Sequence, residues 1–68
     1  MYDLIIIGGG VIAVEMGQMF HRLGCRVTIL EHGARILPSV ESEPALALQE
    51  LLISEGIKIV LKVAFCAV

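Results

Sequence analysis

The chain has 68 residues, of which 57% are hydrophobic, and its formal net charge at pH 7 is −2. Five basic residues spread along the chain form no basic stripe, which argues against a nucleic-acid partner. No apolar run reaches the roughly 18 residues of a membrane helix, so no membrane partner is expected.

A chain this short buries only about 60% of the surface of its unfolded form. We therefore expect an incomplete unit whose apolar surface meets another domain, a second chain or a missing part of its own sheet, with a homo-oligomer as one outcome. Met1–Ile7 contains Asp3 and has no basic start, which argues against a secretory signal. Cys25 and Cys66 form no C-x-x-C pair, and two buried reduced thiols indicate a cytoplasmic protein.

The first half of the chain alternates strand and helix. Tyr2–Ile7 is continuously apolar after Asp3, which predicts a central strand covered on both faces. A helix is predicted over Val11–Leu23, with Gly24 as its left-handed stop. Its predicted inward face comprises Ile12, Met16, Met19, Phe20 and Leu23.

The second half repeats this alternation. Arg26–Leu30 predicts a second strand, followed by a loop over residues 32–40. A second helix is predicted over Ser42–Glu55, which Ser42 could cap, with Pro44 in its first turn and Gly56 as its stop. Its predicted face comprises Ala45, Leu48, Leu51, Leu52 and Glu55. Ile57–Leu61 predicts a third strand, and Val63–Val68 an extended apolar tail.

The predicted fold class is therefore α/β, a partial Rossmann-type β-α-β-α-β unit around a three-stranded parallel sheet. We expect the strand order 3-2-1 with right-handed crossovers. No linker divides residues 1–68, so they are predicted to form one dinucleotide-binding domain that is incomplete.

The strand–glycine–helix order is the context in which G-x-G-x-x-G/A predicts dinucleotide binding. Gly8 permits the sharp turn, Gly10 lets the backbone approach a pyrophosphate, and Ala13 permits close helix–strand packing. Gly17 offers another close approach, one helical turn later. The pyrophosphate would face the N–H groups and positive dipole end of the first helix. The candidate binding residues here are Gly8, Gly9, Gly10, Val11, Ile12 and Ala13.

Glu31 lies about 20 residues beyond the turn, where an acidic side chain binds the ribose hydroxyls of NAD. Its charge would repel a 2′-phosphate, so NAD is favoured over NADP. Arg35 is a further candidate, either for a phosphate or as a solvated loop charge. His32 is a further candidate binding residue, although both His32 and His21 fit surface positions. Neither histidine has partners at metal-ligand spacing, so no metal is predicted.

The segment Gly8–Gly17 resembles the NAD-domain fingerprint of the flavoprotein pyridine nucleotide-disulfide oxidoreductases. The resemblance continues through Arg22–Glu31, Arg35–Pro38 and Leu51–Ile57. Glu31 followed by Arg35-Ile36-Leu37-Pro38 is most similar to the dihydrolipoamide dehydrogenase type. The resemblance implies that Glu15 pairs with a lysine beside the flavin, which makes Glu15 a catalytic candidate in a parent enzyme that carries FAD.

The resemblance also implies parts that these residues do not contain. The family has an FAD fingerprint, a redox-active C-x-x-x-x-C pair and an interface domain. We therefore expect an NAD-binding module that docks on a flavin domain or a second chain and is not catalytic alone. Two alternatives stay open: a non-enzymatic structural or assembly fragment, and an FAD-binding fragment. The sequence Tyr2–Gly10 alone could equally begin a flavin domain, whereas Arg35–Pro38 favours the nicotinamide domain.

Overall fold

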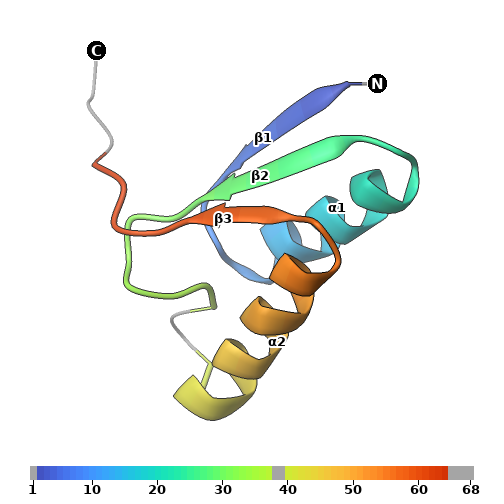
Figure 1. Cartoon of the computed structure of the whole chain (residues 1–68). Helices are drawn as coiled ribbons and strands as arrows, with labels where there is room; N and C mark the ends of the chain where they lie inside the picture. The colour runs from blue at the N-terminus through green and yellow to red at the C-terminus, as the bar shows by residue number, and fades with distance from the viewer. Residues whose placement is uncertain (1, 38–39, 65–68) are drawn as a thin grey trace.

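The computed structural model describes residues 2–37 and 40–64. The elements alternate in the order β1 (Asp3–Ile7), α1 (Val11–Arg22), β2 (Arg26–Leu30), α2 (Ser42–Ser54) and β3 (Lys58–Val60) (Figure 1). The predicted β-α-β-α-β alternation is confirmed, and the bounds of β2 agree with the prediction. The tail predicted over Val63–Val68 lies mostly outside the described residues.

The three strands form one parallel sheet in the order β1-β2-β3. Ile29 of β2 is in register with Ile6 on one side and Ile59 on the other. Both helices lie on the same side of the sheet (Figure 1). Two successive crossovers of the same hand between neighbouring strands produce this arrangement, because each carries the chain across the same face. The predicted α/β class and strand order are confirmed.

One face of the sheet carries the core. Val27 and Ile29 of β2 are buried beneath the helices, whereas Ile5 and Ile7 of β1 point to the other face and are 64% and 69% exposed. Within the described residues β1 is therefore covered on one face, where its continuous apolar sequence predicted two. We call the exposed side of the sheet the open face. It is defined by Ile5, Ile7, Leu30 and Val60, whose side chains the strand register places on the same side of the sheet.

The predicted inward face of α1 is wrong in most of its members. Ile12 and Leu23 are 73% and 72% exposed, and only Phe20 of the predicted set packs against the core. The helix instead buries Val14 and Gly17. A Cβ atom at Gly17 would lie 3.3 Å from Ile29 Cδ1 and 3.5 Å from Val27 Cγ1. Gly17, the smallest residue, thus sets the contact, because its lack of a side chain lets the helix axis approach the sheet. The larger apolar residues form a separate stripe.

The predicted inward face of α2 is correct at three positions. Ala45 and Leu52 are buried and Leu48 is partly buried against the core, but Leu51 is 50% exposed and Glu55 is exposed. Successive helical residues are about 100° apart, so Leu51 and Glu55 lie at the margin of the stripe centred on Ala45 and Leu52.

The start of α2 differs from the prediction in one residue. Ser42 is the first helical residue, and Glu41 occupies the N-cap position without a side-chain capping bond. Ser42 therefore does not cap the helix. Pro44 falls within the first turn, as predicted, where a missing backbone N–H costs little.

Both helices end in the same hydrogen-bonded turn. Gly24 and Gly56 have φ of +95° and +105°, in the region that glycine adopts without strain. Cys25 N–H donates to Phe20 O at 3.0 Å, and Ile57 N–H donates to Leu52 O at 3.0 Å. These bonds close Schellman motifs. The predicted glycine stops are confirmed, and each places the next strand directly beside its helix.

Candidate functional site

The glycine turn lies at the carboxyl end of β1. Gly8 has φ +100° and its N–H donates to Leu30 O at 2.7 Å, so the predicted sharp turn is present and is tied to β2. Gly10 is the N-cap of α1, in an extended conformation. No side chain caps this helix, and no acidic residue lies in its first turn. The amide groups at the start of α1 therefore keep their attraction for an anion.

Glu31 lies at the adjacent carboxyl end of β2 and is only 3% exposed. Its Oε1 accepts the N–H of Gly9 at 2.8 Å, and its Oε2 accepts the N–H of Gly33 at 3.0 Å. His32 Nδ1 lies 3.5 Å from Oε2. Each carboxylate oxygen is therefore held by a backbone donor, and the acid predicted to meet a ribose contacts the glycine turn directly.

These contacts lower the pKa of Glu31 below its ordinary value of 4.5. The Gly33 hydrogen bond is the largest cause, since a backbone donor stabilises the ionised carboxylate. Burial acts in the opposite direction, and the Gly9 hydrogen bond and the charge of His32 then lower the pKa further. Glu31 is consequently a carboxylate at neutral pH.

The loop after Glu31 packs onto the glycine turn. Ile36 is fully buried, and a Cβ atom at Gly9 would lie 3.2 Å from its Cα. Leu37 is 7% exposed, has φ of +51°, and donates its N–H to Gly9 O at 2.6 Å. Only glycine fits at position 9 without displacing this backbone. The N–H of Gly9 is thus bonded to Glu31, and its carbonyl oxygen is bonded to the loop.

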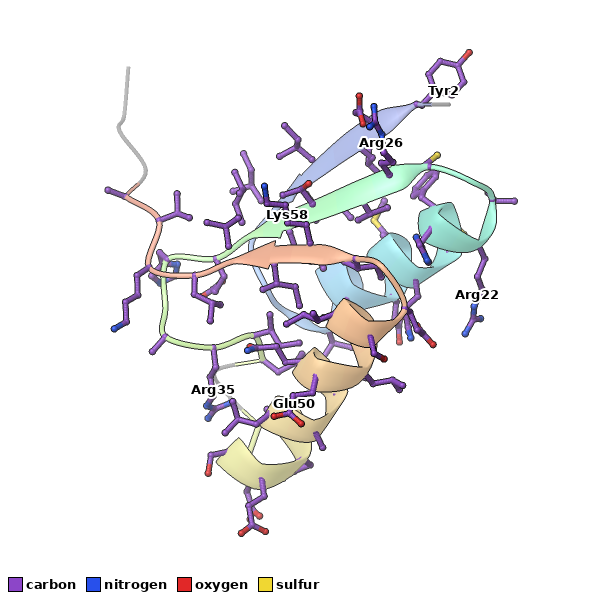
Figure 2. The ribbon with its side chains drawn as sticks, viewed as in Figure 1. Tyr2, Arg22, Arg26, Arg35, Glu50 and Lys58 are labelled. Carbon is purple, nitrogen blue, oxygen red and sulfur yellow. The ribbon has the colours of Figure 1, made fainter. Side chains whose placement is uncertain are left out.

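Arg35 organises the same loop. Its guanidinium donates to the carbonyl oxygens of Leu37 at 2.7 Å, Ile36 at 3.3 Å and Val40 at 2.7 Å. Figure 2 shows the side chain beside the loop, near the first turns of α2. The charge that the sequence offered to a phosphate is therefore engaged with backbone carbonyls in this structure.

Gln49 is a site-related residue that the motifs of the sequence do not indicate. Its Oε1 accepts the N–H of Ile36 at 3.1 Å and so connects α2 to the loop. The available signal was the position of an amide side chain on the inward face of α2, four residues after Ala45 and three before Leu52. A polar group on a buried stripe needs a partner, and here the partner is a loop amide.

The other predicted binding residues lie on α1. Val11 and Ile12 are 53% and 73% exposed, and Ala13 is half-buried. Glu15 is exposed on the same helix, one turn beyond the glycines. The structure therefore brings Gly8–Gly10 together with Glu31, while Glu15 lies on the helix that leads away from them.

The two histidines differ in their surroundings. The side chain of His32 is 75% exposed, which confirms the expected surface position. His21 is partly buried: its Nδ1 is inaccessible and has no hydrogen-bond partner among the described residues, and its ring lies over Gly56. The surface position expected for His21 is therefore only partly met, because the turn after α2 lies against the ring.

Cys25 is a free, half-buried thiol, and Cys66 lies outside the described residues. In the described ranges no group of three His, Cys, Asp or Glu residues could hold a metal ion. Neither helix of the described chain is long and apolar enough to cross a membrane.

Comparisons with known proteins give the same assignment at several levels of similarity. Residues 3–66 match the family described as pyridine nucleotide-disulphide oxidoreductase. The chain is 45% identical over 56 residues to dihydrolipoyl dehydrogenase of Thermus scotoductus, covering 82% of this chain and 12% of that protein. It is 37% identical over 62 residues to mercuric reductase of Staphylococcus aureus, covering 91% of this chain and 11% of that protein.

A solved structure supports this similarity in three dimensions. The HOCl-induced flavoprotein disulfide reductase RclA of Escherichia coli superposes with a TM-score of 0.84 at 37% identity, covering 91% of this chain and 14% of that one. The chain thus spans about an eighth of the length of the curated relatives it matches. Because the family match extends over nearly all of these residues, the chain belongs to the pyridine nucleotide-disulphide oxidoreductase family.

Proposed function

We propose that this chain binds NAD(H), as the nicotinamide-dinucleotide module of an FAD-dependent disulfide oxidoreductase of the dihydrolipoamide dehydrogenase type. The observation that carries the proposal is the 2.8 Å hydrogen bond from Gly9 N–H to Glu31 Oε1. It joins the glycine turn to the acid at neighbouring carboxyl ends of β1 and β2. Ligands of open α/β sheets bind at this edge.

The residues at the start of α1 fit a pyrophosphate. A Cβ atom at Gly10 would meet nothing within 4 Å, so the backbone there is open to a ligand. The helix has no side-chain cap and no acid in its first turn to compete with an anion. Phosphate oxygens could therefore accept hydrogen bonds from the first amides of α1 while lying at the positive end of the helix dipole.

Glu31 fits the adenosine ribose. Each of its oxygens already accepts one backbone N–H, and a carboxylate oxygen can accept a second hydrogen bond. Because the pKa of Glu31 is lowered, the group stays charged at neutral pH. A 2′-phosphate placed there would meet like charge, so NAD is favoured over NADP. Arg35 does not offset this preference while its guanidinium donates to the loop carbonyls.

In the complete enzyme, we propose that electrons pass between the nicotinamide and an FAD held by a flavin domain. Glu15 would act near the flavin, by resemblance to the family. Residues 1–68 contain two cysteines and no C-x-x-x-x-C pair, so we propose that these residues alone bind the dinucleotide without catalysing electron transfer. The covering partner would be the flavin domain or a second chain.

Calorimetric titration with NADH and, separately, with NADPH tests the proposal on the 68-residue chain. We expect saturable NADH binding, weaker NADPH binding, and a loss of the difference in Glu31→Gln. A folded sample that binds neither dinucleotide would contradict the proposal, and preference for NADPH would remove the role of Glu31. Titration with FAD forms a third arm, in which tighter binding of FAD than of NADH would favour a flavin-binding module.

A second function is favoured by the open face. Ile5 and Ile7 are large apolar side chains that are 64% and 69% exposed. Burying them against a second copy or another domain would remove apolar area from water, at about 25 cal/mol per Å². A structural or assembly role predicts self-association that is independent of NADH. Light scattering with and without saturating NADH distinguishes this role from dinucleotide binding.

A further inference from the structure

From the loop contacts we infer that Gln49 is a positioning residue for the dinucleotide site: through Ile36 it holds the Gly9 amide against Glu31. This inference rests on the proposed binding of NAD(H) at Gly9 and Glu31. Gln49 lies on α2, outside both the glycine turn and the strand that ends in the acid. Its effect on the site is carried by a short chain of hydrogen bonds and packed backbone.

The first step of this chain joins α2 to the loop. Gln49 Oε1 accepts the N–H of Ile36 at 3.1 Å, and Ile36 is fully buried. A buried amide that loses its acceptor keeps the cost of desolvation. The loop is therefore most stable in the conformation in which the backbone N–H of Ile36 donates to Gln49.

The second step joins the loop to the glycine turn. A Cβ atom at Gly9 would lie 3.2 Å from both Cα and Cγ2 of Ile36, so the two residues are in close contact. The next residue, Leu37, donates to Gly9 O at 2.6 Å. The N–H and the carbonyl of Gly9 belong to two successive planar peptide units that meet at its Cα, so anchoring Gly9 O to Leu37 restricts the dihedral angles through which Gly9 N–H could turn away from Glu31.

The third step reaches the acid. Gly9 N–H donates to Glu31 Oε1 at 2.8 Å. Arg35 holds the same loop by donating to its backbone carbonyl oxygens, whereas Gln49 holds it by accepting a backbone N–H. Without Gln49, we expect Ile36 to move from Gly9, the Gly9–Glu31 bond to open more often, and the carboxylate to lose its fixed orientation toward a ribose.

Amide hydrogen exchange without any ligand tests this inference. In Gln49→Leu, we expect exchange at Gly9 to accelerate about tenfold, the effect of losing about 1.4 kcal/mol of local protection. Exchange at Ile29, in the centre of the sheet, should change less than about twofold. Gln49→Glu retains an acceptor oxygen and should restore slow exchange at Gly9. Glu50→Gln, on the exposed face of the same helix, is the matched control (Figure 2).

Three results would overturn the inference: unchanged exchange at Gly9 in Gln49→Leu, equal acceleration at Gly9 and Ile29, or failure of Gln49→Glu to restore protection. If Gln49→Leu does not fold, Gln49→Ala is measured in the same way, and unfolding of both variants would make Gln49 a determinant of the fold instead. NADH titration is the second readout, with about a three- to tenfold rise in Kd expected for Gln49→Leu. Absence of NADH binding in the wild-type chain contradicts the proposed function, whereas an unaffected Gly9 amide contradicts the role of Gln49.

Discussion

Gly9 and Glu31 are 22 positions apart in the sequence, yet the amide of one donates to the carboxylate of the other at 2.8 Å. The bond crosses from the turn after β1 to the end of β2. A single side chain therefore both closes the turn and belongs to the site at which a ribose is proposed to bind. Substitution of Glu31 is therefore expected to change both the free energy of unfolding and the affinity for the ligand. Substitutions at other positions are expected to change one without the other.

The stability of the chain should decrease below pH 4.5 through Glu31. The pKa of Glu31 is lower in the folded state, so between the two pKa values the unfolded chain binds more protons. The stabilisation is complete above the ordinary value of 4.5 and is lost as pH falls through the folded value. Urea unfolding from pH 3 to pH 7 measures it. Glu31→Gln should flatten this dependence and lower stability at pH 7 by about 1–3 kcal/mol, because one backbone donor loses its acceptor.

Glu50→Gln, an exposed change on α2, is the control for the loss of a carboxylate. It should retain the pH dependence of the wild-type chain. An equally steep dependence in Glu31→Gln would show that other carboxyl groups cause it.

Gly10→Ala should separate binding from folding. Gly10 has φ of −76°, and a Cβ atom there would meet nothing within 4 Å, so the unfolding midpoint should hardly change. A methyl group would nevertheless occupy the space in which a pyrophosphate approaches the backbone. We expect the Kd for NADH to rise at least about tenfold, the equivalent of 1.4 kcal/mol. Unaltered affinity in a stable variant would place the pyrophosphate elsewhere.

Gly17→Leu should destabilise the contact between α1 and the sheet. Three side-chain atoms lie within 3.6 Å of the position of an added Cβ, so a longer side chain would force the helix outward. We expect a loss of about 1–3 kcal/mol in the free energy of unfolding, as in other overpacked cores.

Gly17→Ala provides the comparison. It adds helix propensity worth about 1 kcal/mol and requires Ile29 Cδ1 to shift by only a few tenths of an ångström. Its unfolding free energy should stay within about 1 kcal/mol of wild type. If Leu were tolerated as well as Ala, the close approach of α1 would not depend on Gly17.

Ile5→Thr combined with Ile7→Thr should reduce self-association without unfolding the chain. Both side chains are more than half exposed on the open face, and threonine retains the β-branched shape that strands favour. The light-scattering mass at high concentration should fall, while the circular dichroism spectrum should be preserved. Ile29→Thr, on the covered face, should instead unfold the chain, since Ile29 is fully buried. Equal masses for the double variant and wild type would remove the open face as the contact.

The alternation of elements was predictable because apolar runs, glycines and prolines act locally. Gly24 and Gly56 end their helices as expected, through hydrogen bonds that depend only on neighbouring residues. The buried face of α1 was not predictable by periodicity. Hydrophobic spacing selects the largest side chains, whereas the helix approaches the sheet through Gly17, which hydrophobicity scales rank low.

The contact between the glycine turn and Glu31 follows residue types that the sequence singles out, but the other connections of the candidate site were not predictable. Gly8–Gly10 and Glu31 follow from the spacing of a known motif. The contact from Gln49 to Ile36 joins residues that no local pattern relates, and it depends on how the loop folds back onto α2. The hydrogen bonds from Arg35 to three loop carbonyls likewise depend on tertiary structure. The sequence alone could not distinguish an arginine bonded in this way from a solvated charge.

The two helix-to-strand turns, at residues 23–25 and 55–57, are short and closed by the same pair of bonds. The connections at the opposite edge are unequal in length, since residues 8–10 separate β1 from α1, whereas residues 31–41 separate β2 from α2. Variation in length is therefore least costly at the edge where the ligand is proposed to bind. Relatives could gain or lose residues after Glu31 and so alter ligand preference. The turns at the opposite edge would still hold both helices in place against the sheet.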